Sequence, residues 1–92
     1  MRQIIIIFEF QPINYGRQIS FKEMIRKYPQ FAFITNNSCI IWTDDTVVNV
    51  RDNLITGIGI GDKLFASEIS APAAWTTTIT TIVSEYVIKN LK

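Results

Sequence analysis

Few side chains in this 92-residue sequence can do acid–base, nucleophilic or metal chemistry. The sequence has no histidine and a single cysteine, Cys39. Ser-His-Asp triads, Cys-His pairs, cysteine zinc clusters and an internal disulfide are therefore excluded. Cys39 lies in an apolar stretch with no base beside it, so we interpret it as a small hydrophobic residue. The sequence assigns no catalytic residue.

Carboxylates offer two candidate metal positions. Glu9 stands within the apolar run IIIIFEF, residues 4–10. It either binds Mg²⁺ with a second copy of itself at a two-fold axis, or is a strand-end carboxylate that faces solvent or pairs with lysine or arginine. The second interpretation is favoured. Asp44 and Asp45 precede Thr46 and are better explained as helix-capping residues than as a metal pair.

Basic residues offer a candidate phosphate-binding surface. With 9 basic and 8 acidic residues the net charge is only +1, so no overall basic excess indicates nucleic-acid binding. Several cations nevertheless cluster around the first expected helix, and one lies on the second. They form either a solvated face or a phosphate-contacting patch that a dimer would double. The candidates are Arg17, Lys22, Arg26, Lys27 and Arg51.

The expected elements that position these residues follow the order β-α-β-β-α-β-α. The β-branched run predicts a buried first strand, the Ser20–Glu23 capping box and Pro29 bound a first helix, and Phe31 to Thr43 predicts a hairpin. The sequence predicts a single α+β domain over 1–92, a ferredoxin-like βαββαβ sandwich with its core in residues 3–70 and an additional C-terminal helix. The expected ranges are 3–10, 20–28, 31–35, 39–43, 46–56, 64–69 and 73–90.

The expected sheet has apolar residues on both faces, although two helices cover only one. The residues expected on the second face are Ile5, Ile7, Ile40 and Trp42. Either a second subunit or the C-terminal helix covers them. The helix would use the stripe Trp75, Ile79, Ile82, Val83 and Tyr86. We expect a homodimer with the four second-face residues at its interface.

An ordered set of short motifs over residues 38–75 resembles a known family. The matching pieces are Ser38-Cys39-Ile40-Ile41-Trp42-Thr43-Asp44, Val50-Arg51-Asp52-Asn53-Leu54, Gly61-Asp62-Lys63-Leu64-Phe65, Glu68-Ile69 and Trp75. In order, spacing and placement they are similar to the small SinR-like proteins of the CRISPR-associated Cas2-like group. The resemblance implies a ferredoxin-like fold, a homodimer and a nucleic-acid-related role. Cas2-like proteins typically carry an aspartate at the end of the first strand, and Glu9 stands at that place.

Three functions remain open at this point. The leading one is a dimeric SinR-like protein that binds in a nucleic-acid context, and the alternatives are a metal-dependent nuclease using Glu9 and a protein-only interaction module or toxin–antitoxin-type component. We expect a cytoplasmic protein, because no signal peptide is recognised and no apolar run approaches the roughly 18 residues that cross a bilayer. No membrane partner and no disulfide are expected.

Overall fold

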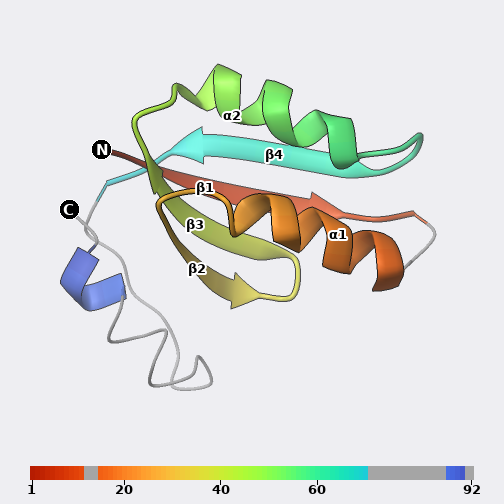
Figure 1. Cartoon of the computed structure of the whole chain (residues 1–92), viewed down its shortest axis with the longest axis horizontal. Coiled ribbons are helices and arrows are strands. Elements are labelled where there is room, and N and C mark those ends of the chain that lie inside the picture. Colours follow the sequence, from red (N-terminus) through yellow and green to blue (C-terminus); the bar gives the residue numbers. More distant parts are fainter. Residues whose placement is uncertain (12–14, 71–86, 91–92) are drawn as a thin grey trace.

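The computed structural model describes residues 1–11, 15–70 and 87–90 of the chain. Within them the fold is α+β, with one four-stranded antiparallel sheet, two α-helices and a short 3-10 helix (Figure 1). The elements are β1 (Arg2–Glu9), α1 (Tyr15–Ile25), β2 (Gln30–Thr35), β3 (Ser38–Thr43), α2 (Val47–Leu54), η1 (Ile55–Gly57) and β4 (Lys63–Glu68).

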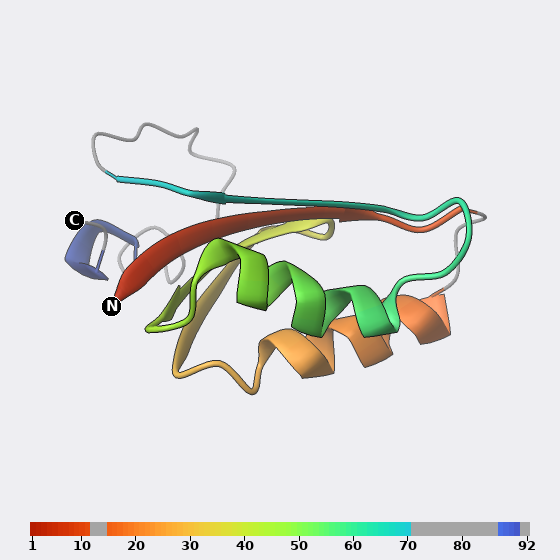
Figure 2. The ribbon, with the colours of Figure 1, turned by 90° about the horizontal axis from the view of Figure 1, so that it is seen from above.

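The strands lie in the order β2-β3-β1-β4, so β1 is central and β2 and β4 form the edges. β1 pairs antiparallel with both neighbours, Ile5 standing opposite Ile40 of β3 and Ser67 of β4. Figure 2 shows α1 and α2 side by side against one face of the sheet. The opposite face is called the open face below.

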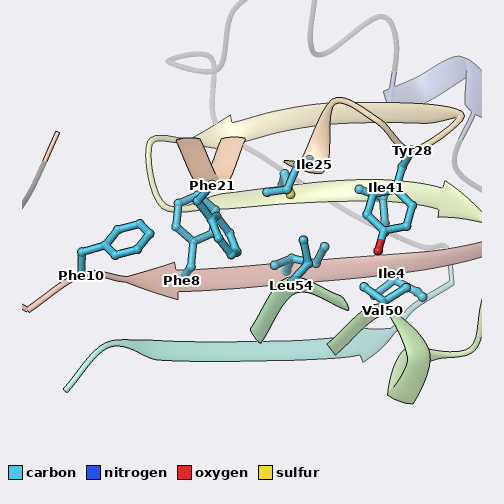
Figure 3. Packing of buried hydrophobic residues seen from close by; sticks show 11 residues of the cluster. Ile4, Phe8, Phe10, Phe21, Ile25, Tyr28, Ile41, Val50 and Leu54 are labelled. Atoms are coloured by element: carbon cyan, nitrogen blue, oxygen red, sulfur yellow. The ribbon is translucent and has the colours of Figure 1, made fainter. Parts of the chain in front are cut away.

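The main core lies between the sheet and the two helices. Alternate residues of β1 supply it from the sheet, because successive side chains of a strand point to opposite faces. Phe8, Phe10 and Phe21 form its aromatic end, with ring centroids 4.7 to 6.1 Å apart (Figure 3). The fully buried members are Ile4, Ile6, Phe8, Phe21, Ile25, Cys39, Ile41, Val50 and Leu54.

A smaller apolar cluster lies on the open face. Ala32, Ile40 and Trp42 are buried there together with Val87 of a short helical turn at 87–90. The Trp42 indole donates to the Asn90 carbonyl at 3.1 Å and to Gln3 Oε1 at 3.3 Å. The turn at 87–90 therefore covers one end of the open face. The rest of the expected helix over 73–90, with its stripe from Trp75 to Tyr86, lies outside the described residues.

The predicted elements that fall on described residues agree with the structure except at the first helix. Its predicted start at Ser20 is wrong: α1 begins at Tyr15, and Ser20 lies inside it. Arg17 explains the longer helix, because its guanidinium pairs with Asp62 and packs over the Phe10 ring at 5.0 Å. Tertiary contacts of this kind override local capping signals. The predicted end near Pro29 is close to the observed end at Ile25.

The second helix begins near its predicted start, but the expected capping by Asp44 and Asp45 is wrong. Thr46 is the N-cap of α2, and its hydroxyl accepts from the Asn49 N–H at 3.2 Å. The two preceding carboxylates, of Asp44 and Asp45, are exposed at this helix start. Within the described part of the chain, no helix has the length and apolar character that crossing a membrane requires. Cys39 is a free, buried thiol.

Candidate functional site

Two cations and two aromatic rings meet where α1 faces the edge strand β2. The Lys22 ammonium lies 5.6 Å from the centroid of the Phe33 ring, and the Arg26 guanidinium carbon lies 5.1 Å from it. Phe31 meets the same ring edge to face, with centroids 5.9 Å apart. These four residues are called the α1–β2 patch below.

Local geometry explains why these side chains converge. Lys22 and Arg26 are four residues apart on α1 and therefore stand on one side of the helix. Phe31 and Phe33 are two residues apart on β2 and share its helix-facing side. Cations are attracted to the negative face of an aromatic ring, at about 0.5–1 kcal/mol for exposed pairs. Phe33 thus holds two positive charges on one surface.

The charge of this region is partly balanced. Arg26 Nη1 lies 2.8 Å from Glu23 Oε1, in an exposed i,i+3 pair. Lys27 lies beyond the end of α1, where it lines a hollow together with Tyr28, Asp44 and Asp45. Burial raises the pKa of the Tyr28 hydroxyl, the hydrogen bond from Asn53 opposes that rise, and the Asp45 charge adds to it. Lys27 therefore faces an acidic neighbourhood, whereas Lys22 and Arg26 form the cationic surface.

The other two candidate phosphate-binding arginines lie apart from this patch. Arg17 pairs with the Asp62 carboxylate, whose side chain is fully buried. Arg51 lies on α2 and donates from Nε and Nη2 to one oxygen of Asp52, at 3.1 and 2.9 Å. The structure brings only two of the five candidates, Lys22 and Arg26, together around one ring.

The Asp62 carboxylate is a polar junction whose partners the sequence did not predict. Besides Arg17, it accepts from the backbone N–H groups of Gln11 and Gly59, each at 2.8 Å. It thereby ties the end of β1, the first turn of α1 and the loop before β4 to one another. The sequence signal was the Gly59–Asp62 turn, where a carboxylate follows two glycines.

The metal expectation at Glu9 stays a prediction, because it requires the Glu9 of a second copy. Glu9 is exposed on the open face, its Oε1 accepts from Gln11 Nε2 at 2.5 Å, and Lys63 stands opposite it on β4. Among the described residues, no three histidine, cysteine, aspartate or glutamate side chains come together as metal ligands would. One chain supplies a single carboxylate beside a lysine, so Mg²⁺, which prefers several oxygen ligands in octahedral geometry, would need the second Glu9 of a dimer.

Burial of its thiol disfavours nucleophilic chemistry at Cys39. Burial raises the pKa of its thiol to about 12, and the nearby Lys22 charge lowers it only in part. A thiol that stays protonated at neutral pH is inert, because the thiolate is the nucleophile. Cys39 is a core residue between the sheet and the helices, as the sequence interpretation expected.

The four expected interface residues have different surroundings on the open face. Ile40 and Trp42 are buried beneath the C-terminal turn, and Ile5 packs against the same cluster. Ile7 is 45% exposed and stands opposite Phe65 of β4, which is 58% exposed. The open face therefore has one covered end and one exposed apolar end.

The fold and this surface define an α+β protein with a basic and aromatic patch. Its described residues hold no assembled catalytic centre. Comparison with protein-family models and with curated proteins finds no match.

Proposed function

We propose that this protein is a small homodimeric binding protein that contacts the phosphate backbone of nucleic acids through its α1–β2 patch. One observation carries the proposal: Lys22 and Arg26 lie over the same Phe33 ring, at 5.6 and 5.1 Å. A cation over a ring keeps donors free for phosphate oxygens, and an aromatic side chain beside it offers a surface for a base. Such contacts bind without reading sequence.

Two further observations support a SinR-like, Cas2-like relationship as part of this proposal. The order β2-β3-β1-β4, with both α-helices on one face, suits a ferredoxin-like βαββαβ sandwich. The motifs over residues 38–75 resemble that family in order and spacing. A C-terminal helix over 73–90 and a cytoplasmic location complete the proposal.

Salt dependence tests the proposal quantitatively. A dimer presents two copies of Lys22 and Arg26, and hence about four phosphate contacts. At about −0.9 per contact, the slope of log K against log salt for duplex DNA is expected to be about −4. Fluorescence anisotropy with labelled duplex and single-stranded oligonucleotides, from about 50 to 200 mM salt, measures this slope.

A pair of charge-matched double variants tests the location. Lys22→Gln with Arg26→Gln removes both patch cations and should reduce the slope to near zero. Arg51→Gln with Lys89→Gln removes the same charge from α2 and the C-terminal turn, and should leave the slope unchanged. Equal losses in both variants would mean that general charge, and not the patch, governs binding.

Two other outcomes would replace the proposal. No binding by the parent protein at low salt would favour a protein-only interaction module. Mg²⁺-dependent cleavage of the oligonucleotide that is lost in Glu9→Gln would favour a nuclease. Both measurements use the same oligonucleotides, so the three functions are separated within one experiment.

A further inference from the structure

A hollow of about 530 Å³ lies where the turn after α1 meets the loop between β3 and α2. Its volume falls within the range of about 300–1,000 Å³ that is usual for small-molecule sites. Tyr28 lines it, at the opposite end of the main core from Phe10 (Figure 3). The hollow shares no residue with the α1–β2 patch, so it is a second and separate surface feature.

Two buried hydroxyl groups line this hollow. Tyr28 is 9% exposed and Thr43 is 4% exposed. The Tyr28 hydroxyl accepts from Asn53 Nδ2 at 2.9 Å, and the Thr43 hydroxyl accepts from the Asp45 N–H at 3.2 Å. Neither hydroxyl donates to another described residue. Each therefore has a proton available for an acceptor atom of a ligand.

The rim of the hollow carries one charge of each sign. Lys27 and Asp45 are both exposed there. Among the described residues neither forms an ion pair, with the other or with a third group. Asp44 differs, because the Met1 amino group lies 4.0 Å from its Oδ1. The hollow thus has a cation and an anion that do not compensate each other.

We propose that this hollow binds a small zwitterion, an α-amino acid with an apolar side chain. The carboxylate of the ligand lies between the Lys27 ammonium and the Tyr28 hydroxyl, and its ammonium group meets the Asp45 carboxylate. An ion of one sign is attracted by one rim charge and repelled by the other, whereas a zwitterion compensates both. Met24 and Pro29 line the same hollow and offer apolar contact to the side chain of the ligand.

The state of the Tyr28 hydroxyl agrees with this orientation. Burial raises its pKa, the hydrogen bond from Asn53 opposes that rise, and the nearby Asp45 charge adds to it. The hydroxyl therefore stays protonated at neutral pH and is a donor, which suits a carboxylate and not an ammonium group. Asp45 acts on the same hydroxyl, so the two ends of the ligand would be held by neighbouring groups of one hollow.

Three matched probes test the class of ligand. L-Leucine carries both charges, N-acetyl-L-leucine keeps only the carboxylate, and L-leucinamide keeps only the ammonium group. Titration of the full chain, followed by the amide resonances in NMR spectra, measures affinity and location together. A ligand of this size in an open hollow binds weakly, so we expect a dissociation constant of about 1 mM for L-leucine. Each one-charge probe should bind at least about 10-fold more weakly, because it loses a charge-assisted hydrogen bond.

Two charge-removing variants test the assignment of the two ends. Lys27→Gln should weaken L-leucine and N-acetyl-L-leucine at least about 10-fold and leave L-leucinamide no weaker. Asp45→Asn should weaken L-leucine and L-leucinamide and leave N-acetyl-L-leucine no weaker. Both residues are exposed, so the fold should be retained. Lys89→Gln and Asp52→Asn remove the same charges elsewhere and should leave L-leucine binding unchanged.

The remaining outcomes overturn the proposal. Equal binding of L-leucine and N-acetyl-L-leucine would make the hollow a simple anion site, and equal binding of L-leucine and L-leucinamide would make it a simple cation site. No response to L-leucine at about 10 mM, ten times the expected dissociation constant, would remove the site. Shifts confined to residues away from Lys27, Tyr28 and Asp45 would place binding on another surface. None of these results bears on nucleic-acid binding by the α1–β2 patch.

Discussion

Asp62 connects three segments that are far apart in the chain. Its side chain is fully buried, and all of its partners are donors: the Arg17 guanidinium and the backbone N–H groups of Gln11 and Gly59. Space around it is tight, since a Cβ added at Gly59 would lie 2.6 Å from Arg17 Nη2. A buried carboxylate whose partners are all donors depends on keeping its charge.

Asp62→Asn should therefore destabilise the fold. The amide keeps the shape but turns an NH₂ group toward donors and removes the negative charge with which Arg17 pairs. Because Arg17 is 36% exposed, we expect a loss of about 2–3 kcal/mol, below the full cost of breaking a buried pair. Asp52→Asn, in the exposed Arg51 pair, is the control and should lose less than about 1 kcal/mol. Urea unfolding compares them, and equal losses would contradict the role of Asp62.

Cys39 gives stability a pH dependence on the alkaline side. Burial raises the pKa of its thiol from its ordinary 9.0 to about 12. Below pH 9 the thiol is protonated in both states and contributes no pH dependence. Between pH 9 and about 12 the unfolded chain releases this proton and the folded chain keeps it, so the free energy of unfolding falls as pH rises. The slope approaches about 1.4 kcal/mol per pH unit.

The Cys39→Ala variant isolates this effect. Urea unfolding at several pH values between about 8 and 10 should give a flatter profile for the variant than for the parent. Tyr28, whose pKa burial raises above its ordinary 10.0, is present in both proteins, so its titration cancels from the comparison. Identical slopes in parent and variant would mean that the thiol titrates alike in both states.

At the scale of elements, α2 depends on one capping hydroxyl. Thr46 Oγ1 accepts from the Asn49 N–H, whereas Asp45 stands outside the cap. Thr46→Ala should lower the free energy of unfolding by about 1 kcal/mol, the usual cost of an unsatisfied N-terminal N–H. Asp45→Ala should change it by less than about 0.5 kcal/mol. Thermal unfolding of both variants measures the difference, and the reverse ranking would assign the cap to Asp45.

The strands were the most predictable elements, because alternation is a local property. Ile4, Ile6 and Phe8 on one face and Ile5 and Ile7 on the other follow directly from the period of two. The start of α1 was not predictable in this way. Ser20 and Glu23 form a valid local cap signal, but Arg17 gains its partner from Asp62, 45 residues away. No window of local sequence contains that contact.

The candidate site was predictable in part for the same reason. Lys22 and Arg26 are spaced to share a helix side, so the cationic surface could be anticipated. Its aromatic component could not, because Phe33 reaches α1 only after β2 has joined the sheet. Arg17 and Arg51 lie apart from the patch, where they pair with Asp62 and Asp52 respectively. The charge pattern of the sequence alone does not predict these pairs.

At the scale of the whole molecule, the open face has one covered end and one exposed end. The turn at 87–90 buries Ile40 and Trp42, while Ile7 and Phe65 remain exposed beside the β4 edge. The sequence predicted that either a second subunit or a C-terminal helix covers this face. The two are compatible, because the turn covers one end only and leaves the other end available to the proposed second subunit.

The covered end can be tested with two neighbouring residues of the C-terminal turn. Val87 is 4% exposed and packs in the cluster with Trp42, whereas Ile88 is 68% exposed. Val87→Ala should lower the free energy of unfolding by about 1.5–2.5 kcal/mol, through lost apolar burial and a residual cavity. Ile88→Ala removes more carbon atoms but should cost less than about 0.5 kcal/mol, because its side chain is already in water. Equal losses would mean that the turn does not pack on the sheet.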